Sequence, residues 1–260
     1  MSRSFRRGSR LGKYRIQATL GSGSFARVYK ARDEVEGRIV ALKVPNEAVI
    51  ESRLDALLKE VRIMVRLDHP NILPILNADI VDKRLVIAYP LAQETLASRL
   101  QRRMSGATIQ SILEDVIDGA AYAHEKRVIH CDINPHNILL FEDGTAKLAD
   151  FGIAKIAINT VMAGSGSGTV GYLSPDQAMG RPSFRSDVFS IGLIAYRMFA
   201  KELPRWPYAW PPIGHPRLRS KVTPEMIAWI RRSIVVDERK RFASATQMAR
   251  AYERIEQVLR

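Results

Sequence analysis

The sequence has only one cysteine, Cys131, among its 260 residues. A single thiol cannot form a disulfide within the chain, and so few cysteines are typical of a reducing compartment, so we expect a cytoplasmic protein. No apolar run approaches the ~20 residues that a membrane-spanning helix needs. The basic start of the chain lacks the apolar core of a secretory signal peptide. These absences exclude a disulfide-stabilised scaffold and predict no membrane span in this chain.

Acidic side chains are also scarce: 27 Asp and Glu residues stand against 40 Lys and Arg residues, which gives a formal net charge of +13. Such a balance favours anionic partners, such as acidic proteins or nucleic acids. The basic residues are spread along the chain, however, and no aromatic residues interleave with them in a stacking pattern. We therefore expect a largely solvated basic surface that favours acidic partners, and we do not expect a nucleic-acid interface.

The first third of the chain predicts a strand-rich unit. Residues 1–12 form a basic arm that we expect to be flexible. Alternation of apolar and polar residues then predicts several strands, and one segment carries apolar residues at helical spacing. The predicted strands are 14–20, 26–32, 38–44, 72–77 and 85–89, and the predicted helix is 53–67.

After Pro90 the pattern changes to that of a mainly helical unit. The predicted helices are 95–103, 109–126, 187–200, 224–234 and 244–259. A short hairpin is expected from residues 137–141 and 145–148, and the Gly- and Ser-rich stretch 156–174 reads as a mobile loop. We therefore predict an α+β protein with a smaller unit at 13–87, a hinge at 88–92 and a larger unit at 93–260.

The most informative polar residues lie in the run from His130 to Asn137 and at Asp150. The run contains an acid, Asp132, and a carboxamide, Asn137, while Asp150 precedes a phenylalanine and a flexible glycine. Magnesium prefers oxygen ligands and usually takes one or two carboxylates together with substrate phosphates. The set therefore suits the orientation of a hydroxyl beside a metal-bound polyphosphate.

Three further motifs precede this run. They are a glycine pair at Gly21 and Gly23, the apolar strand Val40–Lys43 and the segment around Glu60. In this order the motifs resemble those of the protein kinase superfamily, closest to its serine/threonine branch. The resemblance covers nearly the whole chain. It implies a bilobal fold with a small, mainly antiparallel β-sheet N-lobe that has one key helix, and a larger, mainly helical C-lobe.

The resemblance also implies roles for single residues. Asp132 would accept the proton of the incoming hydroxyl, and Asn137 and Asp150 would hold magnesium. Lys43, aligned by Glu60, would hold the α- and β-phosphates of ATP. The catalytic residues are thus Asp132, Lys43 and Asn137. The implied nucleotide-binding residues are Gly21, Gly23, Val28, Ala41, Lys43, Glu60, Ala88, Tyr89 and Leu139.

Other residues match structural positions of the family. His130 is expected in the core, Asp187 as a structural acid, and Asp176 as the partner of Arg241. The segment 168–175 resembles the substrate-docking loop of serine/threonine kinases, which favours a Ser or Thr acceptor.

Three positions depart from the family pattern. Ala26 replaces the third glycine of the loop, and Cys131 replaces an arginine that often grips a phosphate on the activation loop. A neutral thiol cannot do this, so we expect activity that is independent of phosphorylation between residues 156 and 169. Asn134 replaces a lysine that contacts the transferred phosphate. Because a carboxamide cannot neutralise developing charge, we expect slower chemistry.

The sequence therefore predicts an ATP- and magnesium-dependent protein kinase that transfers the γ-phosphoryl group to Ser or Thr of proteins, with autophosphorylation left open. The alternative is a pseudokinase that acts as a nucleotide-binding scaffold or regulatory module, which the three departures favour. A small-molecule phosphotransferase of the same fold is a further alternative, against which the docking loop argues. A nucleic-acid-binding function is supported only by net charge.

Overall fold

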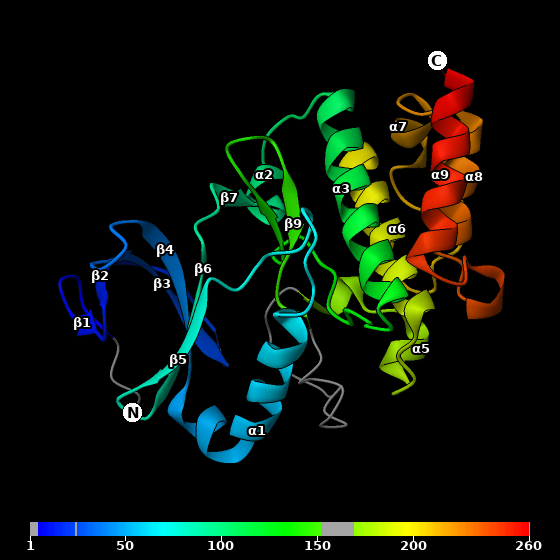
Figure 1. Cartoon of the computed structure of the whole chain (residues 1–260). Helices are drawn as coiled ribbons and strands as arrows, with labels where there is room; N and C mark the ends of the chain where they lie inside the picture. Colours follow the sequence, from blue (N-terminus) through cyan, green and yellow to red (C-terminus); the bar gives the residue numbers. More distant parts are fainter. Residues whose placement is uncertain (1–4, 24, 152–168, 260) are drawn as a thin grey trace. The chain divides into compact units, whose positions relative to one another are not determined.

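The structure is a computed structural model that describes residues 5–23, 25–151 and 169–259 (Figure 1). The chain divides into two compact units, the first of residues 1–68 and 73–92 and the second of residues 69–72 and 93–260. Among the described residues, no helix combines the length and the apolar character that crossing a membrane requires.

The first unit is built on an antiparallel sheet of six strands in the order β1-β2-β3-β4-β6-β5. These strands are β1 (Arg10–Leu11), β2 (Tyr14–Ser22), β3 (Ala26–Asp33), β4 (Ile39–Pro45), β5 (Asn77–Val81) and β6 (Arg84–Pro90). One helix, α1 (Glu47–Met64), belongs to the same unit. Side chains alternate between the two faces of a strand, and one face of this sheet carries a buried apolar cluster. The cluster includes Tyr14, Ile16, Tyr29, Ala31, Val40, Leu42, Val44, Val86 and Ala88.

The second unit is mainly helical. Its long helices α3 (Gly106–Glu125), α6 (Phe184–Ala200) and α9 (Ala245–Leu259) pack against one another, and α8 (Pro224–Ser233) packs against α6 and α9 (Figure 1). The shorter helices are α2 (Leu96–Arg99), α5 (Pro175–Ala178), α7 (His215–Arg219), η1 (Thr169–Tyr172) and η2 (Glu238–Lys240). A small sheet pairs β7 (Glu94–Thr95), β8 (Ile138–Leu140) and β9 (Ala146–Leu148).

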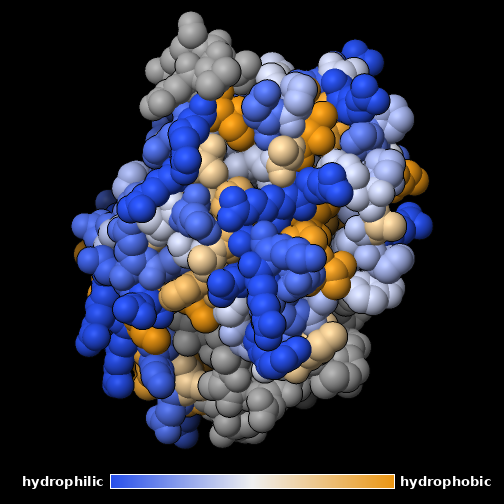
Figure 2. Space-filling model, turned by 90° about the vertical axis from the view of Figure 1, so that its right-hand side faces the viewer, coloured by the Kyte–Doolittle hydropathy of each residue, from blue (hydrophilic) through white to orange (hydrophobic). Residues whose placement is uncertain are grey.

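Side-chain caps explain where the long helices of the second unit begin. Ser105 accepts a hydrogen bond from the Thr108 amide before α3, and Ser183 forms a capping box with Ser186 at the start of α6. Such caps satisfy amide groups that the first helical turn leaves without partners. Nearly every side chain of α6 is buried, so this helix is the core of the unit. Seen from the side of α8 and α9, the surface is mostly hydrophilic, with hydrophobic residues in small separate spots (Figure 2).

The predicted fold class is confirmed, and most predicted strands and helices lie within a few residues of their positions, but the strand predicted at 72–77 is wrong. The Asn71 carbonyl accepts the Leu148 amide at 2.9 Å, and the Asn71 side chain donates to the Ala146 carbonyl at 3.1 Å. Ile72 forms only an isolated bridge to Leu148. These long-range bonds hold Asn71 and Ile72 in the second unit, whereas residues 73–77 belong to the first, and the strand there begins only at Asn77.

Other boundaries also differ from the prediction. Helix α1 begins at Glu47 instead of residue 53, and the helix predicted at 95–103 is a single turn that ends at Arg99. Thr95 lies outside that turn because its hydroxyl caps it, accepting the Ser98 amide at 3.2 Å. Of the loop predicted at 156–174, residues 156–168 lie outside the described part. The remainder is ordered: Tyr172 belongs to η1 and is buried.

Candidate active site

One face of the first sheet gathers most of the predicted nucleotide-binding residues. The register pairs Gly21 with Val28, Val28 with Lys43, and Ala41 with Tyr89. Cross-strand partners share a face, and so do residues two apart on one strand, such as Ala41 and Lys43. These five residues therefore lie on the face opposite the buried apolar cluster. The side chains of Val28, Ala41 and Lys43 are only half-buried there.

The two glycines lie at the tip of the β2–β3 hairpin. The Gly23 amide donates to the Ala26 carbonyl at 2.9 Å, and the Asn46 side chain donates to the Gly23 carbonyl at 3.2 Å. A Cβ atom added at Gly21 would meet no atom within 4 Å, and one added at Gly23 would meet the Ala26 oxygen at 3.6 Å. The packing of the protein itself therefore does not require these glycines, whereas close approach of a ligand to the backbone would.

Ala88 and Glu60 lie elsewhere in the first unit. Ala88 belongs to the buried cluster on the other face, and its carbonyl accepts the Leu76 amide at 2.8 Å. A nucleotide contact to this carbonyl would therefore have to use its second lone pair. Glu60 is half-buried on α1. The roles of both residues toward a nucleotide remain predictions.

In the second unit, Asp187 holds the loop that carries the predicted base. Its carboxylate accepts three hydrogen bonds: from the His130 amide at 2.8 Å, from the Cys131 amide at 2.9 Å and from Nε2 of His124 at 2.9 Å. Cys131 has a φ of 63°, a left-handed conformation that is costly for a residue with a Cβ. Its carbonyl accepts the Gln177 side chain at 2.5 Å. Hydrogen bonds on both sides of Cys131 thus hold this conformation, and the role of Asp187 as a structural acid is confirmed.

His130 is a core histidine, as predicted. It is 1% exposed, and its ring stacks on Phe151 with 4.2 Å between centroids. Its Nδ1 atom accepts the Asp132 amide at 3.2 Å, so the proton is on Nε2, which donates to the Ala149 carbonyl at 3.1 Å. Burial lowers the pKa of this imidazole, which keeps it neutral. His130 therefore connects the segment that contains Asp132 with the one that contains Asp150.

The Asp132 carboxylate is held by two carboxamides. Asn134 donates to one carboxylate oxygen and Asn137 to the other, each at 3.0 Å. The same two Nδ2 atoms also donate to the Asp132 main-chain carbonyl, at 3.0 and 2.9 Å. The Asn134 side-chain oxygen accepts the His136 amide at 2.9 Å. Two hydrogen bonds thus hold the carboxylate of the predicted base, one from each carboxamide, and two more hold its main-chain carbonyl.

The two predicted metal ligands are linked through the main chain. The Ala149 amide donates to the Asn137 carbonyl at 2.8 Å. Asp150 is the next residue after Ala149, so this bond holds it near the Asn137 backbone. Because Nδ2 of Asn137 donates to Asp132, the Oδ1 atom is the one that remains for a cation. Among the described side chains, no three or more His, Cys, Asp or Glu residues gather as a metal site. A carboxylate and a carboxamide fit a magnesium ion that takes its remaining ligands from phosphates and water.

Cys131 is buried, with 6% of its surface exposed. Burial, followed by the charges of Asp187 and Asp132, raises the pKa of its thiol, so the reactive thiolate does not form at neutral pH.

We therefore expect Cys131 in the folded protein to react with iodoacetamide at pH 8 at least about 10²-fold more slowly than in the urea-unfolded chain, because reaction would require opening of the structure. Mass spectrometry of the alkylated protein over time measures this ratio. Equal rates in buffer and in urea would contradict the buried thiol.

The predicted pair of Asp176 and Arg241 is confirmed. The Arg241 guanidinium donates to the Asp176 carboxylate at 2.7 Å, and both side chains are buried. Burial alone would raise the pKa of this carboxyl, but the Ser186 hydroxyl and the Arg241 charge outweigh it, and the pKa lies below its ordinary value. The pair joins α5 to the end of η2 and so supports the loop before α6.

A cavity of about 530 Å³ lies beside the loop of Asp132 in the second unit. Its lining includes Pro135 and His136 from that loop, Tyr172 from η1 and Arg197 from α6. The Arg197 guanidinium donates to the Tyr172 hydroxyl at 2.5 Å, and none of the described residues that line the cavity carries a carboxylate. No local pattern in the sequence indicates that Arg197, sixty-one positions after His136, lines the same cavity.

Comparisons with known proteins agree with this geometry. The protein kinase domain family matches residues 14–252. Serine/threonine-protein kinase 36 of Pongo abelii is 36% identical over 191 residues, which cover 72% of this chain and 14% of that protein. The DNA damage-responsive serine/threonine-protein kinase RqkA of Deinococcus radiodurans is 30% identical over 249 residues, which cover 84% of this chain and 35% of that protein. The chain thus spans a minor part of these relatives.

Solved structures show the same fold. The kinase domain of Mycobacterium tuberculosis PknI superposes with a TM-score of 0.74 at 23% identity, covering 97% of this chain and 99% of that one. The apo form of PpkA-294 gives a TM-score of 0.80 at 20% identity, covering 95% of this chain and 99% of that one. With the family match over residues 14–252 and the curated relatives, the conclusion is that this chain belongs to the protein kinase family, in its serine/threonine branch.

Proposed function

We propose that this chain is an active protein kinase that uses ATP and magnesium to phosphorylate Ser or Thr residues of proteins, itself included. The observation that carries the proposal is the fixed carboxylate of Asp132, which Asn134 and Asn137 hold by one hydrogen bond to each oxygen. This arrangement holds both oxygens of the carboxylate in place. It suits a base that orients a hydroxyl.

Each residue of the proposed site then has a definite task. Asp132 orients the acceptor hydroxyl and takes its proton as the bond to phosphorus forms. Asn137 and Asp150 provide oxygen atoms for magnesium, and Lys43 provides an ammonium group for the phosphates. ATP, when bound, supplies the γ-phosphoryl group, whose transfer depends mainly on positioning and charge stabilisation. Gly21 and Gly23 leave the backbone open to the phosphates, while Val28, Ala41 and Leu139 supply apolar surface for the base.

The test is direct. The purified protein is incubated with γ-labelled ATP and magnesium, alone and with a casein-type acidic protein or a histone-type basic protein. Transfer that depends on Asp132 supports the proposal. Thermal stabilisation by ATP without any transfer would instead support the pseudokinase, in which the site binds nucleotide and the substitutions at residues 26, 131 and 134 mark lost catalysis.

A single buried cysteine is in keeping with the cytoplasmic location that we also propose.

Replacement of Asn134 by lysine is expected to raise kcat by about tenfold or more, because an added cation would offset charge on the transferred group. A lysine can also donate to Asp132 as Asn134 does, although the His136 amide loses its acceptor at a cost of about 1 kcal/mol. Initial rates at saturating ATP measure the change. The matched variant is Asn134→Met, of similar length and without charge, and equal rates for the two variants would refute this account.

The cavity beside the loop of Asp132 supports acidic substrates. It is lined by the guanidinium of Arg197 and the imidazole of His136, together with hydroxyl and amide groups, and the described part of the chain contributes no acid to it. A carboxylate close to the acceptor residue could pair with Arg197 there, in a charge-assisted bond. The proposed substrates are therefore Ser- or Thr-containing segments rich in Asp and Glu.

We expect Arg197→Glu to reduce the preference for an acidic over a basic peptide by about tenfold or more, because the charge in the cavity is reversed. The ratio of kcat/KM for two peptides that differ only in the charges flanking one serine reports this preference. Arg205→Glu changes net charge equally at an exposed site outside the cavity lining. The same loss of preference in both variants would show that only overall charge matters.

A further inference from the structure

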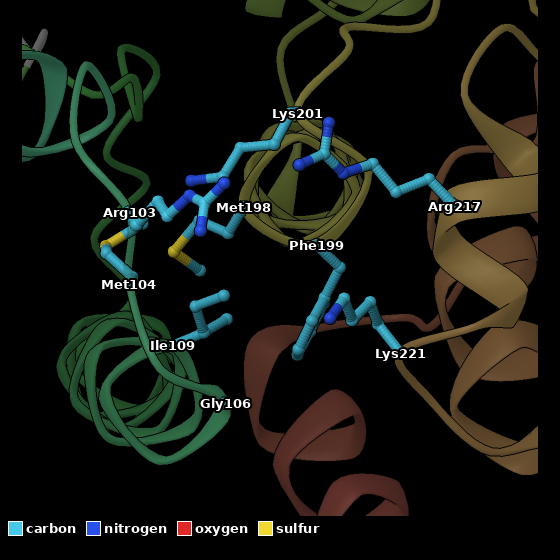
Figure 3. Close-up of a pocket in the computed structure, with 9 residues that line it drawn as sticks. All are labelled: Arg103, Met104, Gly106, Ile109, Met198, Phe199, Lys201, Arg217 and Lys221. Carbon is cyan, nitrogen blue, oxygen red and sulfur yellow. The ribbon is translucent and has the colours of Figure 1, made fainter.

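A second cavity in the helical unit lies apart from all the predicted site residues. It has a volume of about 330 Å³ and lies between the start of α3, the end of α6 and α7 (Figure 3). Its apolar lining consists of Met104, Ile109, Met198 and Phe199. The last three of these are at most 6% exposed, so the apolar lining is fixed by the core of the unit.

Basic side chains make up the rest of the lining. Arg103 precedes α3, Lys201 ends α6, Arg217 lies in α7 and Lys221 follows it. Figure 3 shows the nitrogen ends of Arg103, Lys201 and Arg217 directed toward one another above Met198. Among the residues that the structure describes, no acidic one lines the cavity. Within the described parts of the chain, none of the four basic residues forms an ion pair, and the Lys201 ammonium donates only to the Arg102 carbonyl, at 3.4 Å.

This convergence of like charges is unfavourable without a counter-ion. Burial, followed by the charges of Arg217 and Arg99, lowers the pKa of Lys201, so its charged form is disfavoured here. The C-terminal end of α6 stabilises a cation at Lys201, but this explains none of the three other basic residues, which come from different segments. Glu202, the acidic residue that directly follows Lys201 in the chain, is exposed and does not line the cavity.

We propose that this cavity is a binding site for a phosphate monoester that carries a compact apolar group. Two guanidinium groups match the oxygens of a phosphate in bidentate geometry, and a dianion offsets more of the four positive charges than a carboxylate does. The side chains of Ile109 and Met198 provide the surface for the apolar group. The volume lies at the small end of the ~300–1,000 Å³ range of ligand sites, which suits a small ring or a single side chain.

The site predicts a specific spectroscopic result. With methyl-¹³C methionine in the chain, titration with phenyl phosphate in the absence of nucleotide should shift the signals of Met104 and Met198, which line the cavity. The signals of Met226 and Met248, outside the lining, should stay in place. Benzyl alcohol, which has the ring without the charge, should bind at least about tenfold more weakly. No shift of either lining methyl at 10 mM phenyl phosphate, or equal binding of the alcohol, would overturn the proposal.

Charge removal gives the second test. Lys201→Met together with Arg217→Gln should weaken phenyl phosphate binding by about tenfold or more for each cation removed. The double variant should fold, because it relieves repulsion. Arg219→Gln, in the same helix but outside the lining, should bind as the parent does. Unchanged affinity in a folded double variant would also overturn the proposal.

The same titration distinguishes the two sources of such a ligand. A phosphoserine peptide with a neighbouring leucine that binds tighter than phenyl phosphate identifies a phosphorylated protein. Equal or weaker binding of the peptide identifies a small phosphorylated molecule. Because neither nucleotide nor turnover enters the measurement, its result is independent of whether the chain is an active kinase.

Discussion

Replacement of Asp132 by asparagine is expected to lower kcat by about 10²–10⁴, the range over which a positioned base accelerates proton transfer. The side chain keeps its size, but it can no longer take a proton. Its new NH₂ group would also face one of the two amide donors, Asn134 or Asn137, that now bind the carboxylate. Initial rates of labelled phosphate transfer at saturating ATP measure the loss.

Two controls make this result specific. Glu125→Gln removes an acid at the exposed end of α3 and should leave kcat unchanged. ATP should stabilise the Asp132→Asn protein against heat as well as it stabilises the parent, because the base does not bind the nucleotide. Transfer at the parental rate in the variant would exclude Asp132 as the base and would leave the proposed mechanism without its proton acceptor.

In the catalytic loop, Asn134 in place of a lysine removes a positive charge but keeps the position of the Asp132 carboxylate. At position 134 the sequence predicts slower chemistry, because the expected cation is absent. The structure adds that Asn134 has a role of its own. It donates a hydrogen bond to the Asp132 carboxylate and accepts one from the His136 amide. The substitution therefore affects charge at the phosphate more than the position of the base. This supports a slow kinase over a pseudokinase.

Much of the fold could be predicted because the signals are local. The helices of the second unit are predicted from the spacing of their apolar residues, although α3 and α6 begin just after the caps Ser105 and Ser183, earlier than predicted. The shared face of Gly21, Val28 and Lys43 also follows from strand alternation once the register is known. The register itself needs the structure, since it depends on bulges in β2 that no local pattern marks.

Long-range bonds account for what could not be predicted. The stretch 72–77 is apolar and reads as a strand, but the bonds of Asn71 to Leu148 and Ala146 draw its first residue to the other unit. The basic part of the second cavity is formed by Arg103, Lys201 and Arg217, which are far apart in the sequence. Scattered basic residues look like a solvated surface until the fold brings them together.

Replacement of Asp187 by alanine is expected to lower the free energy of unfolding by at least about 3 kcal/mol. Three buried donors lose their acceptor, the amides of His130 and Cys131 and the Nε2 atom of His124, and each unsatisfied group costs about 1–3 kcal/mol. Without these bonds, the left-handed conformation of Cys131 also loses its support. Urea unfolding followed by far-UV circular dichroism measures the loss.

The comparison variant is Glu125→Ala, which lies next to His124 on α3 but is exposed, and which should change stability by no more than about 0.5 kcal/mol. Measurement of kcat distinguishes the role of Asp187 in holding the loop from its role in stabilising the fold. At a temperature where the Asp187→Ala protein is still folded, its kcat should fall sharply while ATP still stabilises it, because the loop that positions Asp132 has lost its anchor. A folded variant with parental kcat would show that Gln177 and the two carboxamides hold the loop without Asp187.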